Sequence, residues 1–392
     1  MLLSTAVLFL AGILLSRLAA KLRLPPLLGM LIAGLLLGPY ALNLLTPNLL
    51  GLAGELRQFA LVVILIRLGL AINLTDVKAI GSAVFLLALV PATLEIAAIT
   101  LVGPLVLGIT VLEAALLGVV LAAVSPAVIV PQMLKLMGSG YGTANRIPAL
   151  IMVSASLNGI YVLVLFSVFL NKAISGQDFQ FVRLLDIPVS VVLGLALGLI
   201  AGWLMSLVFT WLDLGRISNG LIVLAVGFLL FALEQAAAPA IPISALLAVV
   251  VSVMLVAQRN SQIAINLADA FADLWVPAEL MLFGLVGAAI NVPAALPYIL
   301  PAFVIVLVGL VFRAFGSYLS LVNSRLNRNE RLFVCLSNTP KATIQAAIAA
   351  IPLAAGVPAG GVILAVAMLA ILLTAPLAAF AMNVTYQKLL TK

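Results

Sequence analysis

The chain has 392 residues, of which 65% are hydrophobic and 8% charged, with a formal net charge of +7 and a mean hydropathy of +1.36. Apolar runs of about 18 residues recur along its length, which excludes a soluble protein and predicts an all-α polytopic membrane protein. A β-barrel is excluded because its strands would alternate in polarity. The single Cys335 and the absence of histidine exclude an internal disulfide and cysteine- or histidine-based metal sites.

In chain order, the hydropathy pattern predicts thirteen membrane spans. They lie near residues 1–20, 25–45, 57–74, 80–107, 111–134, 147–171, 184–211, 218–236, 239–257, 274–295, 298–322, 332–355 and 360–386. The first run lacks a basic n-region and a small-residue cleavage site, so we interpret it as a retained span rather than a signal peptide.

The basic residues predict the orientation of these spans. Loops on one side carry only Arg57, Lys172 and Arg183. Loops on the other side carry Arg17, Lys21, Arg23, Lys78, Lys135, Arg146, Arg216, Arg259, Arg325, Arg328, Arg331, Lys388 and Lys392. Basic loops stay in the cytoplasm, so we expect the N-terminus outside, the C-terminus in the cytoplasm, and no need for a nucleic-acid partner to explain the net charge.

The fifth span contains Ser125 and Pro126 at its centre. A proline there removes a backbone donor and frees a carbonyl, which lipid cannot satisfy. The sixth span has one polar patch, residues 154–159, in an otherwise apolar run. We therefore expect a broken helix and a polar site at this place.

An internal repeat relates the two halves of the chain. GLAIN at 69–73 is followed 218 residues later by GAAIN at 287–291. The same offset sets Glu95 opposite Arg313, and sets the break at Ser125 near the polar stretch 338–343 of the twelfth span. Seven spans separate the copies, so their topologies are inverted, a pattern that indicates a transporter with two broken helices at the midplane.

Six segments carry a resemblance to a known family: LPPLLG at 24–29, LGP at 37–39, RLGL at 67–70, VSPAV at 124–128, PAE at 277–279 and PKATIQAA at 340–347. In these the chain resembles a bacterial monovalent cation:proton antiporter of the sodium/proton exchanger superfamily, over nearly its whole length. The resemblance implies a multi-pass protein of the cell inner membrane that exchanges Na⁺, Li⁺ or K⁺ for protons.

The resemblance also implies an architecture. Residues 1–392 form a single transporter unit with inverted repeats, two crossing broken helices and a homodimeric assembly. Residues 1–79 and 184–295 are mainly dimerisation scaffold, and residues 80–171 and 296–386 are mainly the ion-translocation core. Transport moves the core against the scaffold.

The chain departs from the family pattern in the sixth span. Members carry Asp-Asp or Asn-Asp in the sixth span, and the second aspartate binds ion and proton in turn. Here the pair is Asn158 and Gly159, so that carboxylate is absent. Oxygen ligands for a cation remain on Asn158, Ser125, Ser156 and Thr343, and on carbonyls freed at the breaks, but a neutral site has no evident proton linkage.

Three charged side chains lie within the core spans, and two roles are open for the pair of Glu95 and Arg313 and two for Lys341. Glu95 and Arg313 form a structural ion pair, or Glu95 serves as a substitute proton carrier. Lys341 neutralises half-helix ends at the second break, or couples transport by giving up its proton. Counted together, these three side chains sum to +1, which favours an anion or neutral solute.

The sequence leaves three functions open. The first is a cation:proton antiporter with altered coupling; the second is an uncoupled facilitator or transporter of an anion or neutral solute; the third is a transport-inactive homologue. The chain offers no histidine, no cysteine with a base and no paired carboxylates within one span, so we expect no enzyme, no cofactor and no resident metal.

Overall fold

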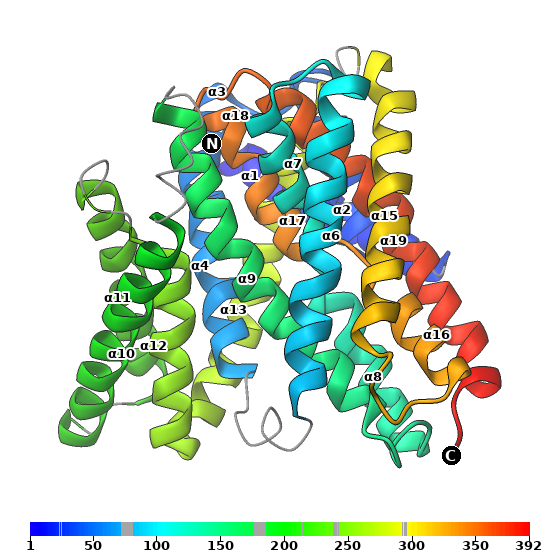
Figure 1. Cartoon of the computed structure of the whole chain (residues 1–392). Helices are drawn as coiled ribbons and strands as arrows, with labels where there is room; N and C mark the ends of the chain where they lie inside the picture. Colours follow the sequence, from blue (N-terminus) through cyan, green and yellow to red (C-terminus); the bar gives the residue numbers. More distant parts are fainter. Residues whose placement is uncertain are drawn as a thin grey trace. The chain divides into compact units, whose positions relative to one another are not determined.

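The structure is a computed structural model that describes residues 1–392 apart from 23, 25, 72–80, 176–185, 213–214, 238–240, 242, 292 and 294–295. Every regular element among the described residues is a helix (Figure 1). Some residues used above lie outside the described part: Arg23, Pro25, Asn73, Lys78 and Arg183.

Within the described part of the chain, eight helices are long and apolar enough to cross a bilayer, so the prediction of an all-helical, multi-pass membrane protein is confirmed. They are α1 (Leu2–Lys21), α6 (Ser82–Leu107), α9 (Ile147–Ser175), α10 (Asp186–Leu212), α11 (Arg216–Ala237), α13 (Ser261–Ala288), α15 (Ile299–Ser320) and α19 (Gly360–Leu389). The shorter elements are α2 (Pro26–Leu37), α3 (Pro47–Gly51), α4 (Ala53–Ala71), α7 (Val111–Ala122), α8 (Pro126–Ser139), α12 (Ala245–Arg259), α16 (Arg328–Ser337), α17 (Thr343–Ala349), α18 (Ile351–Ala354) and the 3₁₀ turn η2 (Leu296–Tyr298).

One predicted boundary is wrong. The tenth span was expected to begin near residue 274, just before Pro277, but α13 begins at Ser261 and Pro277 lies inside it. The preceding turns carry Asp269 and Asp273, which lowered the hydropathy without ending the helix. Glu279 therefore lies in the second half of α13 and not near its start.

Both helix interruptions are present. The first lies between the end of α7 at Ala122 and the start of α8 at Pro126, where Ser125 is extended with φ −92° and ψ 107°. Extended backbone is what a following proline imposes on the residue before it. The second lies between the end of α16 at Ser337 and the start of α17 at Thr343.

The two half-helices that precede the breaks begin with matching caps. Thr110 and Glu113 form a capping box at the start of α7, and Asn327 and Glu330 form one at the start of α16. In each case the second carboxylate oxygen reaches a distant segment. Glu113 Oε1 accepts from the N–H of Ala359, the residue before α19, at 2.9 Å. Glu330 Oε1 accepts from Nδ2 of Asn145, which lies in the turn before α9, at 2.8 Å.

The chain folds into two compact units. Unit 1 comprises Met1–Glu55, Leu74–Val162 and Leu280–Lys392, and unit 2 comprises Leu56–Asn73 and Leu163–Glu279. In unit 1, α6 packs against α7 and α15, so it lies beside the first broken helix. Both breaks belong to unit 1.

Unit 2 is held by close packing of α10 against α12. Gly194, Gly198 and Gly202 lie along α10, and an added Cβ at any of them would come within 3.0 Å of α12 or of its N-cap residue Ser244. Small residues along one face of a membrane helix permit such a close approach of two backbones.

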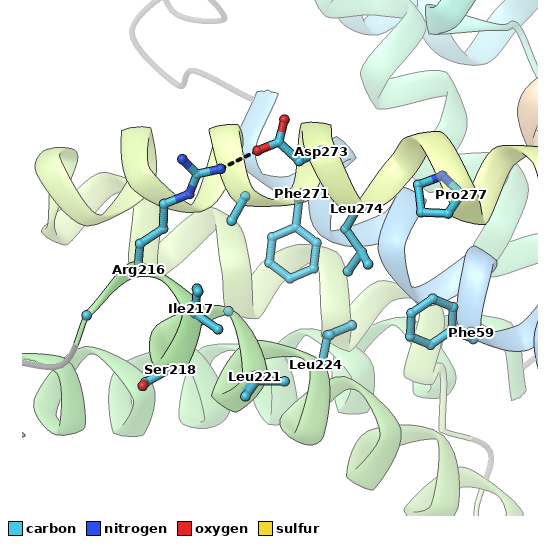
Figure 2. A pocket seen from close by; sticks show the side chains of 13 residues that line it. Phe59, Arg216, Ile217, Ser218, Leu221, Leu224, Phe271, Asp273, Leu274 and Pro277 are labelled. Carbon is cyan, nitrogen blue, oxygen red and sulfur yellow. Dashed lines mark hydrogen bonds and ion pairs between the residues drawn. The ribbon is translucent and has the colours of Figure 1, made fainter.

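Unit 2 also contains a cavity of about 890 Å³ between α4, α11 and α13 (Figure 2). Its lining is mostly apolar, with Phe59 and Phe271 among the side chains, and an exposed ion pair joins Arg216 to Asp273 at 2.6 Å. None of the predicted site residues lines this cavity.

We expect Glu330→Ala to lower the free energy of unfolding by about 0.5–2 kcal/mol, the usual worth of a helix cap. The change removes the acceptor for the Asn327 N–H and for Asn145 Nδ2. The measurement is thermal melting of the purified protein in detergent. Glu55→Ala, at an exposed glutamate in the first turn of α4, is the matched control and should change stability by no more than about 0.5 kcal/mol. Equal melting of the two variants would show that the Glu330 contacts contribute nothing.

Candidate functional site

The two breaks contact each other inside unit 1. The Ser125 N–H donates to the Pro340 carbonyl at 2.9 Å, and the hydroxyls of Ser125 and Thr343 lie 3.4 Å apart. Ser125 and Thr343 are separated by 218 residues and both are buried. The sequence placed these two hydroxyls at corresponding positions of the repeat, and the structure brings them together.

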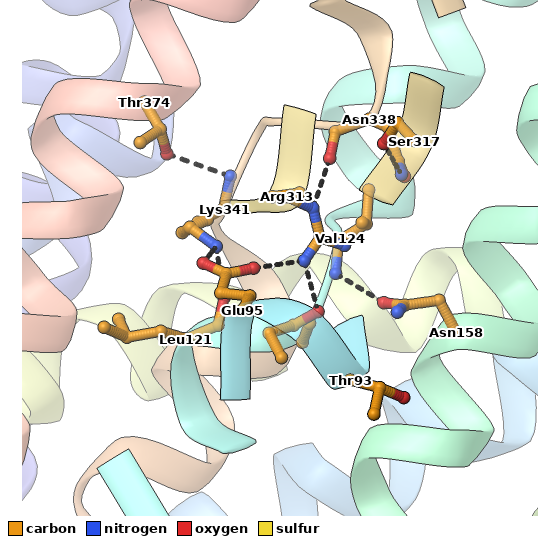
Figure 3. A network of polar contacts seen from close by, with 12 residues as sticks. Thr93, Glu95, Leu121, Val124, Asn158, Arg313, Ser317, Asn338, Lys341 and Thr374 are labelled. Carbon is orange, nitrogen blue, oxygen red and sulfur yellow. Dashed lines mark hydrogen bonds and ion pairs between the residues drawn. The ribbon is translucent and has the colours of Figure 1, made fainter. Parts of the chain in front are cut away.

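A cluster of three charges lies beside the contact between the breaks (Figure 3). Glu95 of α6 accepts from Arg313 Nη1 of α15 through Oε2, and from Lys341 Nζ at 2.6 Å through Oε1. The side chains of all three are no more than 1% exposed. The sequence indicated the pair of Glu95 and Arg313, whereas the contact between Lys341 and the same carboxylate had no signal in the spacing. We call Glu95, Arg313 and Lys341 the core charge cluster.

The carbonyls freed at the first break are already bonded to side chains. Lys341 Nζ donates to the Leu121 carbonyl, Arg313 Nη1 to the Ala122 carbonyl at 2.9 Å, and Gln345 Nε2 to the Ala123 carbonyl. These carbonyls form the negative end of the α7 dipole, and two of the three donors are cations. In this arrangement a cation that binds these carbonyls must replace a side-chain donor, and their role in ion binding stays a prediction.

The second break is held by a similar set of contacts. Arg313 Nε donates to the Asn338 carbonyl at 2.5 Å, and the Asn338 side chain donates to Ser317 Oγ at 2.9 Å. The Lys341 N–H donates to Thr374 Oγ1 of α19 at 3.0 Å. Sequence reasoning missed Ser317 and Thr374, since each is a lone hydroxyl in a long apolar helix, a pattern usually explained by bonding within the helix.

Gln345 was also missed, although it lies within the PKATIQAA segment. Its Oε1 accepts from the Ala342 N–H at 2.7 Å, while its Nε2 donates to the first break. One amide thus satisfies backbone groups of both breaks.

Asn158 of α9 braces the first break. Its Oδ1 accepts from the Val124 N–H at 2.8 Å, and its Nδ2 donates to the Ala88 carbonyl of α6 at 3.0 Å. Ser156 lies two residues earlier, and its hydroxyl donates to the Met152 carbonyl of its own helix at 3.1 Å. The structure thus brings Asn158, Ser125 and Thr343 to the breaks, whereas the Ser156 hydroxyl has a partner within α9. The ion-binding role of all four residues stays a prediction.

Comparison with known proteins identifies the family. Residues 5–386 match the family described as "Sodium/hydrogen exchanger, transmembrane". The chain belongs to the sodium/hydrogen exchanger family. Members of this family are transporters and not enzymes.

The curated relatives of this exchanger-family chain include animal proteins. It is 29% identical to human sodium/hydrogen exchanger 9B2 over 349 residues, which cover 87% of this chain and 65% of the relative. It is 30% identical to exchanger 9B2 of Xenopus tropicalis, of which it covers 64%, and 29% identical to human exchanger 9B1, of which it covers 73%. The chain thus spans just under two thirds of the length of the human and Xenopus tropicalis 9B2 proteins.

A solved structure shares the fold. The structure titled as the sodium proton antiporter MjNhaP1 from Methanocaldococcus jannaschii at pH 8 superposes with a TM-score of 0.85. The alignment covers 100% of this chain and 99% of that chain at 20% identity. At this identity the likeness concerns the fold alone.

The core charge cluster carries one carboxylate and two cations. Moving an ion from water into the protein costs several kcal/mol, which is offset only when each charge has partners. Glu95 has both oxygens occupied, but Arg313 Nη2 has no hydrogen-bond partner among the described residues. Among the described residues, no group of three or more acidic, cysteine or histidine side chains is arranged to hold a metal ion.

We expect Glu95→Gln to destabilise the protein by about 3–5 kcal/mol, because it leaves two buried cations without a counter-charge. Arg313→Met should cost less, since Lys341 still neutralises Glu95. Combining the two changes should cost less than their sum. Melting temperatures in detergent measure the differences.

Arg216→Ala is the control for these variants, because it breaks an ion pair whose side chains are 41% and 81% exposed, worth about 0–1 kcal/mol. Equal melting of Glu95→Gln and Arg313→Met, or strictly additive shifts, would contradict a shared carboxylate.

Proposed function

We propose that the chain is a secondary active transporter that exchanges a monovalent cation, Na⁺, Li⁺ or K⁺, for a proton. The observation that carries this proposal is the meeting of two broken helices beside the buried core charge cluster, in a member of the sodium/hydrogen exchanger family. Interrupted helices of this kind supply freed backbone groups and dipole ends to transporter sites near the midplane.

Lys341 carries the exchanged proton in this proposal. An exchanger needs one group that holds a proton in competition with the cation, and Gly159 supplies none. Lys341 is buried at the second break and donates to both Glu95 and the first break. A buried lysine can lose its proton, whereas an arginine keeps it, so Lys341 and not Arg313 is the exchangeable cation.

The proposal extends to the architecture. Thirteen spans are supported by a helix or a broken helix in each expected range, and the inverted repeat is supported by contacts between residues 218 apart, Glu95 with Arg313 and Ser125 with Thr343. The charge bias of the loops favours the N-terminus outside and the C-terminus in the cytoplasm.

Assembly and localisation follow from the family resemblance. A homodimer in the cell inner membrane is proposed, with residues 1–79 and 184–295 as mainly scaffold and residues 80–171 and 296–386 as mainly transport core.

A second function is favoured by a specific observation. The core charge cluster has an excess of one positive charge, and Arg313 Nη2 is buried without a hydrogen-bond partner among the described residues. Such a site suits a small anion, so an uncoupled anion pathway on the same scaffold is the alternative.

The two functions are separated by flux into proteoliposomes that contain a pH-sensitive dye. Sodium, lithium or potassium added outside should drive protons out and raise the internal pH. Lys341→Gln should abolish this proton movement, because glutamine cannot carry a proton. A folded wild-type protein that moves chloride and leaves the internal pH unchanged in every cation would support the anion pathway and contradict antiport.

We expect Gly159→Asp to lower the half-saturating cation concentration by about tenfold, equivalent to about 1.4 kcal/mol, because it adds a carboxylate beside Asn158. Flux measured against sodium concentration tests this. Asn158→Asp is the comparison variant: it also adds a carboxylate but loses the Nδ2 donation to the Ala88 carbonyl, so it should melt at a lower temperature than wild type. An unchanged half-saturating concentration in a correctly folded Gly159→Asp protein would show that a carboxylate at this position does not strengthen cation binding at the first break.

A further inference from the structure

The ammonium group of Lys341 lies in a small set of oxygens. One is Oε1 of Glu95 at 2.6 Å, and another is the main-chain carbonyl of Leu121 at the C-terminal end of α7. A carboxylate oxygen and a carbonyl at the negative end of a half-helix are the ligand types that hard monovalent cations take in transporters. Both Glu95 and Lys341 are no more than 1% exposed, so the site is closed to water in this arrangement.

We propose that this oxygen pair is the cation site of the exchanger, and that the Lys341 ammonium occupies it when the lysine is protonated. The inference rests on the proposed cation:proton exchange and deepens it by naming the ligands. It moves the cation away from the Asn158 side of the first break to the Glu95 side. The substrate class is a monovalent cation that prefers oxygen ligands.

The contacts of Asn158 support this placement. Its amide oxygen already holds the Val124 N–H, and its amide nitrogen already holds the Ala88 carbonyl. Both ends of the side chain therefore fix the backbone at the first break. Asn158 acts here as a positioning residue that holds the α7 carbonyls near the core charge cluster.

Arg313 fixes the carboxylate while Lys341 leaves. The guanidinium donates to Glu95 Oε2, to the Ala122 carbonyl and to the Asn338 carbonyl, so it bridges both breaks. It stays protonated throughout, and its three contacts hold the Glu95 oxygens in place. Lys341 has a flexible stem and a point charge, which allows its ammonium group to be replaced.

The exchange step balances in charge and atoms. When the site opens to water, the Lys341 ammonium gives its proton to a water molecule, which leaves as hydronium, and the lysine becomes a neutral amine. A cation then exchanges some of its bound water for Glu95 Oε1 and the Leu121 carbonyl. One positive charge leaves and one enters, so the core charge cluster keeps the same sum. The consequence is a one-for-one, electroneutral exchange.

The charged groups that act on Lys341 are Glu95 of α6 and Arg313 of α15, and Thr374 of α19 contacts only its main-chain N–H.

The test is equilibrium binding of radioactive sodium to the purified full-length protein in a buffer that has no other alkali cation. In wild type, the apparent sodium affinity should fall by about tenfold for each unit that the pH decreases, because one proton competes with one cation. In Lys341→Met the ammonium is absent, so sodium should bind with an affinity that does not change with pH.

A matched variant isolates the carboxylate. Glu95→Gln/Lys341→Met keeps the wild-type charge sum of the core charge cluster and differs from Lys341→Met only at Glu95, so it should lose saturable sodium binding. Melting curves establish that both proteins are folded. Saturable binding that survives in this double variant, or its absence in folded Lys341→Met, would overturn the assignment.

Transport measurements separate this inference from the function on which it rests. Exchange in proteoliposomes should proceed at the same rate when a membrane potential of either sign is imposed. A rate that depends on the potential would overturn the electroneutral step while leaving antiport intact. Saturable sodium binding at Glu95 without any proton movement would leave the site standing and remove the proposed function.

Discussion

The site depends on one buried carboxylate, Glu95, that forms ion pairs with two basic side chains at once. Glu95 contacts Arg313 through one oxygen and Lys341 through the other, and none of the three side chains is more than 1% exposed. Each buried ion would cost several kcal/mol alone, so the cluster is stable only as a whole. The carbonyls at the end of α7 reduce this cost because they accept from both cations. The first break therefore helps to stabilise the buried charges, because it frees these carbonyls to accept from the two cations. An unbroken helix would keep the same carbonyls in its own hydrogen bonds.

Much of this arrangement follows from the sequence. Pro126 in mid-membrane predicts the first break, and the offset of 218 residues predicts that Glu95 and Arg313 lie together. Both inferences use backbone chemistry or repetition, which a single sequence displays directly. The helix ends were harder to predict, because α13 continues through Pro277 and includes two aspartates that lower its hydropathy.

Other features of the site could not be predicted, since they depend on where side chains point. Lys341 stands at the second break, and nothing in its spacing relates it to Glu95. Gln345 and the second oxygens of Glu113 and Glu330 reach segments far away in sequence. A likeness of fold alone does not determine such side-chain contacts.

The glycine at 159 supplies no carboxylate beside Asn158, and this limits what the remaining charges can do. With an aspartate there, a cation could bind beside Asn158 while Lys341 stayed on Glu95. Without it, Glu95 is the one acidic side chain among the described residues whose partners, Arg313 and Lys341, also donate to carbonyls at the first break. Lys341 occupies the Glu95 oxygen that Arg313 does not contact. In the exchange that we propose, a cation and the protonated lysine compete for the same place, which is the physical requirement for coupling. Competition at a single oxygen pair would also set the ratio of the two ions at one to one.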